Sequence, residues 1–210
     1  MDEKKKMSKL FQKKLKKEKT LIDVAYELFI SKGVNETAID DIVKKAGVAK
    51  GTFYLYFKDK YDIIDKIILK KTTFIIEETL DVLNKQEIAD FSDRTIFFID
   101  YIIEALRKDK RLLKLIYKNL SWGLFRKAIA NPEQNNRMDE IIKELMKNLK
   151  ISDSNYGELE KTLFMIIELT GSVCYSSIIL EEPDNIDAMK PILFKIIRKM
   201  LPEANTIKKE

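Results

Sequence analysis

One short stretch near the N-terminus carries side chains that are well suited to bind another molecule. Lys50, Thr52, Tyr54 and Tyr56 follow one another closely, and their ammonium and hydroxyl groups can bond phosphate oxygens or base edges. Leu55, in the same stretch, offers only an apolar contact, for example to the methyl group of thymine. This combination of groups is typical of a surface that reads double-stranded DNA.

The pattern around this stretch predicts two short helices joined by a tight turn, between Thr37 and Lys60. Ile39, Ile42 and Val43 form one apolar face of the first helix. Gly47 ends that helix, at a place where a positive φ is often required. In the second helix we expect Phe53 and Phe57 to be buried. This is the form of a helix-turn-helix, which places its second helix in the major groove of DNA. The alternative is an ordinary helical hairpin, for which the run of tyrosines, glycine and lysine has no purpose.

The composition predicts an all-α protein that is large enough to have a real core. The chain has 210 residues, of which 45% are apolar and 35% are charged, with only 6 glycines and 4 prolines. Few turns are therefore signalled, and helix-forming residues dominate. The apolar periodicity indicates about nine helices.

Several classes of chemistry are disfavoured by the residues that this chain lacks. It contains no histidine, which is the usual general base and a common zinc ligand. Its single cysteine, Cys174, falls in an apolar helix, and its carboxylates are dispersed over polar faces. We therefore expect no enzyme activity, no metal site and no cofactor. With no signal peptide and no uninterrupted apolar run of transmembrane length, we expect a cytoplasmic protein without stable membrane association.

The excess positive charge is concentrated at the N-terminus. Residues 1–20 hold nine lysines and three acidic residues, whereas residues 21–60 hold six of each. A basic arm beside a helix-turn-helix suits contact with phosphates, and that contact should weaken as salt rises. One alternative is a solvated, frayed tail. Another is a membrane-surface or protein-interaction helix, to which Leu10, Phe11 and Leu15 lend slight support.

The order of these features divides the chain into three parts. We expect a flexible basic arm over 1–15, a helix-turn-helix domain over 16–60, and a helical ligand-binding and dimerisation domain over 61–210. The domain over 16–60 would contain three helices, the first of them ending near Gly33. The helices expected after it cover residues 60–83, 93–108, 110–130, 132–149, 156–180 and 187–201. The helix over 60–83 would be roughly 36 Å long, enough to connect two domains.

Residues 20–64 resemble the DNA-binding domain of the TetR (tetracycline-repressor) family of bacterial transcription regulators. The resemblance is carried by Phe29, Gly33, Thr37, Ile39, Asp41, Ile42, Ala46, Gly47, Val48, Lys50, Gly51, Thr52, Phe53, Tyr54, Tyr56, Phe57, Lys58, Asp59 and Lys60. It covers about a fifth of the chain. The later helices are similar to the family's variable regulatory domain only in number and order.

The resemblance implies a set of DNA-binding residues. These are Thr37, Ala38, Lys50, Gly51, Thr52, Tyr54, Leu55, Tyr56 and Lys60. In this interpretation Lys60 contacts a phosphate, and Thr37 either caps its helix or contacts the DNA backbone. Asp40 departs from the family pattern, which often has a basic residue there, so that this acid either points elsewhere or reads a cytosine amino group.

The resemblance also implies a homodimer, a pseudo-palindromic operator and a small-molecule effector. We expect the helices over about 156–201 to form the dimer interface as a four-helix bundle. An apolar or amphipathic effector would bind among the aromatic residues of the second domain and tilt the helix over 60–83, lowering DNA affinity. The candidate effector-binding residues are Phe98, Tyr101, Tyr117, Trp122, Phe125, Glu168 and Tyr175. Regulation by a protein partner, or without an effector, is the alternative.

Overall fold

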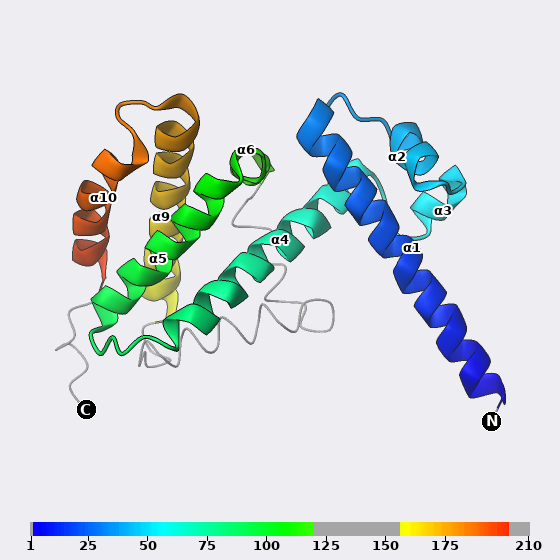
Figure 1. Cartoon of the computed structure of the whole chain (residues 1–210), viewed down its shortest axis with the longest axis horizontal. Helices are drawn as coiled ribbons and strands as arrows, with labels where there is room; N and C mark the ends of the chain where they lie inside the picture. The colour runs from blue at the N-terminus through cyan, green and yellow to red at the C-terminus, as the bar shows by residue number, and fades with distance from the viewer. Residues whose placement is uncertain (1, 120–155, 202–210) are drawn as a thin grey trace. The chain divides into compact units, whose positions relative to one another are not determined.

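A computed structural model describes the chain over residues 2–119 and 156–201, and over these residues every regular element is a helix (Figure 1). Side-chain placement is described for 11–119 and 161–201. The elements are α1 (Asp2–Lys32), α2 (Ile39–Ala46), α3 (Lys50–Tyr54), α4 (Lys60–Leu83), α5 (Phe91–Lys108), α6 (Lys110–Asn119), α9 (Tyr156–Tyr175), the π-helical η2 (Ser176–Leu180) and α10 (Ile186–Met200). The predicted all-α class is confirmed. The helix expected over 132–149 lies outside the described residues.

The chain divides into two compact units, Met1–Lys70 and Lys71–Glu210. The division falls inside α4, about ten residues later than the sequence pattern suggested. The first turns of α4 therefore belong to the helix-turn-helix unit, and the remainder of this helix belongs to the second unit.

Helix α1 begins at Asp2, so the stretch that we expected to form a basic arm over 1–15 is helical from Asp2 onward. The stretch has no glycine or proline and is rich in lysine, which favours a helix. The helix of 31 residues is about 46 Å long. Its described residues up to Lys17 are exposed, including Phe11 at 62%, so this half of α1 has no packing partner within the chain's described part.

The core of the first unit is formed by one apolar face from each of its helices. Its buried residues are Leu21, Ala25, Leu28 and Phe29 of α1, Ile42 and Val43 of α2, Phe53 of α3, Phe57, and Ile63, Ile64, Ile67 and Ile68 of α4. Gly33 (φ 91°) and Gly47 (φ 67°) end α1 and α2 in the left-handed region. Both glycines were expected at these ends, because this backbone conformation is costly for a residue with a Cβ atom.

In the second unit, α9 contacts α5, α6 and α10. Apolar residues from all four helices are buried, among them Ile103 and Leu113 at 0–1% exposure and Ile197 at 0%. Helix α10 begins at Ile186, one residue earlier than predicted, and its cap is Asn185, whose side chain accepts from the N–H groups of Asp187 and Ala188. The loop between η2 and α10 is short and polar, so that these two elements remain neighbours.

The segment Lys161–Leu180 has the length and mean hydropathy of a membrane-crossing helix, with a value of 1.8. This differs from the sequence expectation, which considered only uninterrupted apolar runs. Only 22% of the segment is buried within the chain. Ile166, Cys174 and Ile178 face the core, whereas Phe164 and Met165 are 38% and 49% exposed. The segment therefore also presents apolar side chains away from the core.

Candidate DNA-binding site

Helix α3 is fixed in place by two phenylalanines. Phe53 and Phe57 are 0% and 1% exposed, and their ring centroids lie 5.3 Å apart. Their predicted burial is confirmed. Because these two rings face the core, the residues between them point outward: Tyr54 is 52% exposed and Leu55 is 76% exposed. The outward side of α3 therefore offers both an apolar and a hydroxyl-bearing side chain to solvent.

The remaining predicted DNA-binding residues differ in their accessibility. Ala38, Lys50 and Gly51 are exposed, and Thr52, Tyr56 and Lys60 are half-buried. Thr37 is fully buried, and its hydroxyl donates a 2.7 Å hydrogen bond to the Gly33 carbonyl.

Thr37 does not cap α2, so that part of its prediction is wrong. The cap is Ala38, whose backbone N–H donates to Asp41 Oδ2 at 3.3 Å. The Thr37 side chain instead closes the turn between α1 and α2 through its bond to Gly33. Any contact between this position and DNA must therefore use the backbone at the start of α2, where exposed N–H groups attract anions.

Asp40, the residue that departs from the family pattern, pairs with the start of α3. Its Oδ1 atom lies 2.9 Å from Lys50 Nζ, and both side chains are more than half exposed. The hydrogen bond to Asp40, helped by the attraction of opposite charges, raises the pKa of Lys50. Asp40 therefore points toward Lys50, and it neutralises a positive charge on the surface that α3 presents.

Lys60, at the first position of α4, holds the turn between α1 and α2. Its Nζ atom donates to the carbonyl oxygens of Val34, Asn35 and Thr37 at 2.9, 3.1 and 3.3 Å. An ammonium group has three hydrogens, and here all three have acceptors. A phosphate contact by Lys60 would require it to give up one of these bonds.

Lys66 is a positioning residue that sequence reasoning missed. Its Nζ atom lies 3.2 Å from Glu18 Oε1 on α1, 3.4 Å from the Tyr56 carbonyl, and 4.8 Å from the centroid of the Phe57 ring. One lysine thus joins α1, α4 and the end of α3. The sequence did contain a hint of this role, because Lys66 lies among four isoleucines of α4 that are buried. A charged side chain close to a core needs hydrogen-bonding or charged partners.

The second unit contains an open hollow of about 280 Å³ between α4, α5 and α6. Its lining residues are Lys71, Phe74, Ile75 and Glu78 of α4, Tyr101, Glu104, Ala105 and Lys108 of α5, and Leu112 of α6. Phe74 is 63% exposed, so the hollow presents an aromatic ring to solvent. The Tyr101 hydroxyl donates to Glu78 Oε1 at 3.0 Å across it. We call this feature the α4–α5–α6 hollow.

Of the seven candidate effector-binding residues, Tyr101 lines this hollow and the others lie elsewhere or outside the described residues. Tyr117 and Tyr175 stack on each other, with centroids 4.1 Å apart and ring planes 14° from parallel. Phe98 packs on Leu80 and Leu83 at the end of α4. Glu168 is exposed on α9. Trp122 and Phe125 lie outside the described residues.

The first unit has the geometry of a DNA-reading module. A short helix, held by Phe53 and by Phe57 and Lys66 beyond its end, presents hydroxyl, ammonium and apolar groups to solvent. Within the described residues, no three histidine, cysteine, aspartate or glutamate side chains are grouped so that they could hold a metal ion. These features define the class of protein as a helix-turn-helix DNA-binding protein.

Comparison with known proteins identifies the family. Residues 21–67 match the family model described as bacterial regulatory proteins, tetR family. The uncharacterized HTH-type transcriptional regulator YvdT of Bacillus subtilis is 27% identical over 192 residues, covering 88% of this chain and 94% of YvdT. The fatty acid metabolism regulator protein of B. subtilis is 42% identical over 57 residues, which are 27% of this chain and 29% of that protein.

Solved structures agree at the level of the fold. The transcriptional regulator FadR from B. subtilis, in complex with stearoyl-CoA, has a TM-score of 0.57 at 22% identity, covering 87% of this chain and 98% of FadR. The chain belongs to the TetR family of helix-turn-helix transcriptional regulators. It is a DNA-binding regulator and not an enzyme.

Replacing Asp40 with asparagine should release Lys50 toward DNA. We expect Asp40→Asn to bind random-sequence duplex more tightly at low salt and to steepen the dependence of log affinity on log salt by up to about one unit, because one more lysine can meet a phosphate. Fluorescence anisotropy between 50 and 200 mM KCl measures this. Asp23→Asn, which removes an exposed acid of α1, is the control for charge alone. Equal effects of the two variants would contradict the role assigned to Asp40.

Replacing Lys60 with methionine separates its two possible roles. If Lys60 holds the α1–α2 turn, Lys60→Met lowers the melting temperature and weakens DNA binding, while the salt slope stays as in the parent. A phosphate contact instead predicts a slope shallower by about one unit. The geometry favours the first result. Differential scanning calorimetry and the same anisotropy titration are the measurements, and an unchanged melting temperature would contradict the positioning role.

Proposed function

We propose that this regulator is a repressor that leaves its operator when a small apolar or amphipathic effector binds in the α4–α5–α6 hollow. The observation that carries the proposal is the continuity of α4 across both units. Its first residue, Lys60, bonds three carbonyls of the α1–α2 turn. Further along the same helix, the hollow is lined by Lys71, Phe74, Ile75 and Glu78. A change in the tilt of α4 would therefore displace the helix-turn-helix, as a population shift between two arrangements.

In the proposed complex, α3 enters the major groove. Tyr54 and Leu55 are its exposed central residues, and Thr52 and Tyr56 flank them. Lys50 and Gly51 approach the backbone at the start of the helix, together with Ala38 and the backbone of Thr37 at the start of α2. The lysines of the first half of α1 supply an additional attraction that does not depend on sequence.

The chemistry of the hollow supports an amphipathic effector. Phe74, Ile75 and Leu112 provide apolar contacts, while four charged side chains surround them. Pockets for small molecules commonly combine an apolar lining with a few polar groups that fix orientation. The solved relative FadR is in complex with stearoyl-CoA, which is an amphipathic molecule. A further relative, from Escherichia coli, is described as a probable acrEF/envCD operon repressor, and it is 28% identical over 106 residues.

We also propose that the regulator is a homodimer through α9 and α10. Helix α10 buries Ile186, Leu193 and Ile197 in its own unit but exposes Ile192 at 57% and Ile196 at 43%. These two residues lie one turn apart, on one outward face of the helix. On α9, Phe164 and Met165 are also exposed. Pairing these faces across a two-fold axis would bury them, and the dimer would read a two-fold operator.

A membrane-associated protein is the second candidate, because the segment Lys161–Leu180 is apolar enough to cross a bilayer. The segment includes Lys161, Glu168 and several hydroxyl side chains, and its inner face is part of the second unit's core. Relatives that cover most of the chain are helix-turn-helix regulators. We therefore assign its outer face to the dimer and place the protein in the cytoplasm.

The contact made by the exposed tyrosine of α3 tests the DNA-binding part of the proposal. After selecting bound duplexes from fragmented genomic DNA, we expect Tyr54→Phe to bind the selected operator about three- to tenfold more weakly, because one hydrogen bond is lost. Binding to random duplex should hardly change. Tyr61→Phe, another exposed tyrosine but on α4, is the control. Equal operator affinity of Tyr54→Phe and the parent would exclude a contact by this hydroxyl.

The dimer has a separate test. We expect the parent to sediment at twice the chain mass of 24.6 kDa at micromolar concentration. Ile192→Glu should shift it toward the monomer, because the substitution places a charge in the buried interface. Leu15→Glu introduces the same charge at an exposed apolar residue of α1 and should leave the mass unchanged. A monomeric parent, or a dimer insensitive to Ile192→Glu, would contradict the proposed interface.

A further inference from the structure

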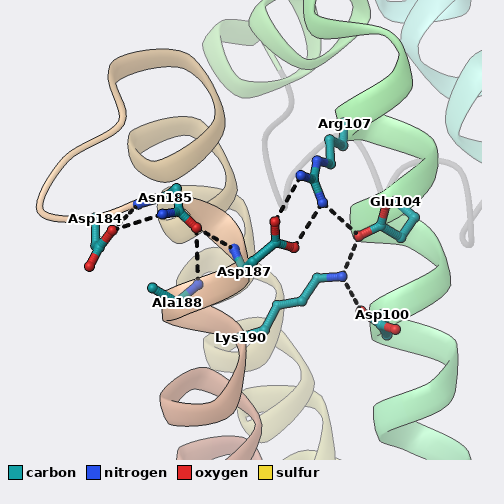
Figure 2. Close-up of polar contacts among 8 residues, drawn as sticks. All are labelled: Asp100, Glu104, Arg107, Asp184, Asn185, Asp187, Ala188 and Lys190. Atoms are coloured by element: carbon teal, nitrogen blue, oxygen red, sulfur yellow. Dashed lines mark hydrogen bonds and ion pairs between the residues drawn. The ribbon is translucent and has the colours of Figure 1, made fainter.

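Five charged residues form a network that joins α5 to the first turns of α10 (Figure 2). They are Asp100, Glu104 and Arg107 of α5 and Asp187 and Lys190 of α10. We call them the α5–α10 ion network. Four of the five side chains are 37–61% exposed, and only Lys190, at 15%, is largely buried, so Lys190 is the charge that most needs its partners.

Lys190 is the centre of the network. Its side chain is only 15% exposed, and its Nζ atom lies 2.6 Å from Asp100 Oδ1. The same ammonium group donates to Glu104 Oε1. Burial works to lower the pKa of Lys190, but the hydrogen bonds to Asp100 and Glu104 prevail and raise it. Lys190 is therefore held as a cation between two carboxylates on successive turns of α5.

Arg107 forms the second link between the two helices. Its guanidinium donates two parallel hydrogen bonds to Asp187, with both N–O distances at 2.8 Å. It also lies 3.5 Å from Glu104 Oε1. Asp187 is in the first turn of α10, next to the Asn185 cap, so that Arg107 holds the beginning of that helix. Glu104 thus receives both cations of the network, as Figure 2 shows.

Glu104 also lines the α4–α5–α6 hollow, and none of the other four residues of the network is among the described residues that line it. The helical repeat of α5 explains this position. Tyr101, Ala105 and Lys108 lie on the face toward the hollow, Asp100 and Arg107 lie toward α10, and Glu104 lies where the two faces meet. The hydrogen bond from Lys190 lowers the pKa of Glu104, which favours the charged carboxylate.

We propose that Glu104 binds the head group of the effector and at the same time couples occupancy of the hollow to α10. This inference rests on the proposed function, because it requires that an effector binds in the hollow. A head group that donates hydrogen bonds, such as an ammonium, would compete with Lys190 and Arg107 for the Glu104 carboxylate. Its binding loosens the attachment of α10, the helix that we assign to the dimer. By linkage, any change that loosens Lys190 from Glu104 strengthens binding of such a ligand.

Two probes with the same twelve-carbon chain and opposite head groups test this inference on the full-length protein. We expect isothermal titration calorimetry to show that the parent binds dodecylammonium at least fivefold more tightly than dodecanoate. Glu104→Gln should remove most of this preference, since it removes the charge that distinguishes the head groups. Lys190→Met should increase the preference severalfold, because it frees Glu104 although Lys190 itself does not line the hollow.

A matched control is available on the same pair of helices. Arg198 of α10 pairs with Asp93 of α5 at 2.6 Å, and neither residue is among those that line the hollow. Arg198→Met should therefore leave the preference as in the parent. Lys190→Arg, which keeps the cation, should also retain the parental preference, and it provides the comparison if Lys190→Met does not fold.

The possible failures are distinguishable. If the parent binds neither probe, the hollow is not an effector site, and both the proposed function and this inference fail. If the parent binds the probes but Lys190→Met and Arg198→Met have the same effect on the preference between them, the inference alone is overturned. The same holds if Lys190→Met lowers the affinity for both probes equally. Hydrogen exchange over 186–200 is the second readout. We expect dodecylammonium to accelerate exchange there in the parent and not in Glu104→Gln, and an equal response in both would overturn the coupling.

Discussion

The burial of Phe53 and Phe57 is the constraint on which the DNA-binding surface depends. Helix α3 has only five residues, far too few to be stable by itself. The two rings anchor it in the core of the first unit, and Lys66 lies over one of them while also binding Glu18 and the Tyr56 carbonyl. Once the phenylalanines are placed, Tyr54 and Leu55 must face solvent. The surface offered to DNA is thus a consequence of packing on its opposite side.

The electrostatics of this surface differ from a simple basic patch. Lys60 and Lys66 use their charges for positioning, and Lys50 is neutralised by Asp40. The N-terminal half of α1 holds most of the chain's excess of lysine, on a helix that extends beyond the core. In the function that we propose, attraction to DNA and recognition of its sequence are therefore carried by different elements. That separation suits a regulator that must search non-specific DNA before it reads an operator.

The second unit combines apolar packing with charge pairing, and the two have different effects. Ile186, Leu193 and Ile197 seat α10 in the core, while its first turns are tied to α5 by ions. Apolar contact is non-directional and tolerates small shifts, whereas a hydrogen-bonded ion pair has few acceptable geometries. A ligand that competes for one carboxylate can therefore alter the attachment of a helix without dismantling the core beneath it.

By itself the sequence determined what depends on neighbours along the chain. The helical periodicity, the glycines that end α1 and α2, the burial of Phe53 and Phe57 and the helix-turn-helix all follow from local pattern. Only the tertiary structure decided the partners of Asp40, Lys60, Lys66 and Glu104, because these contacts join one helix to another or to the α1–α2 turn, with partners up to 86 positions apart. The tertiary structure also decided that the space between α4, α5 and α6 forms a hollow. Periodicity marks apolar faces but not how fully neighbouring side chains fill the space between them, so Tyr101 lines the hollow while Tyr117 and Tyr175 stack on each other.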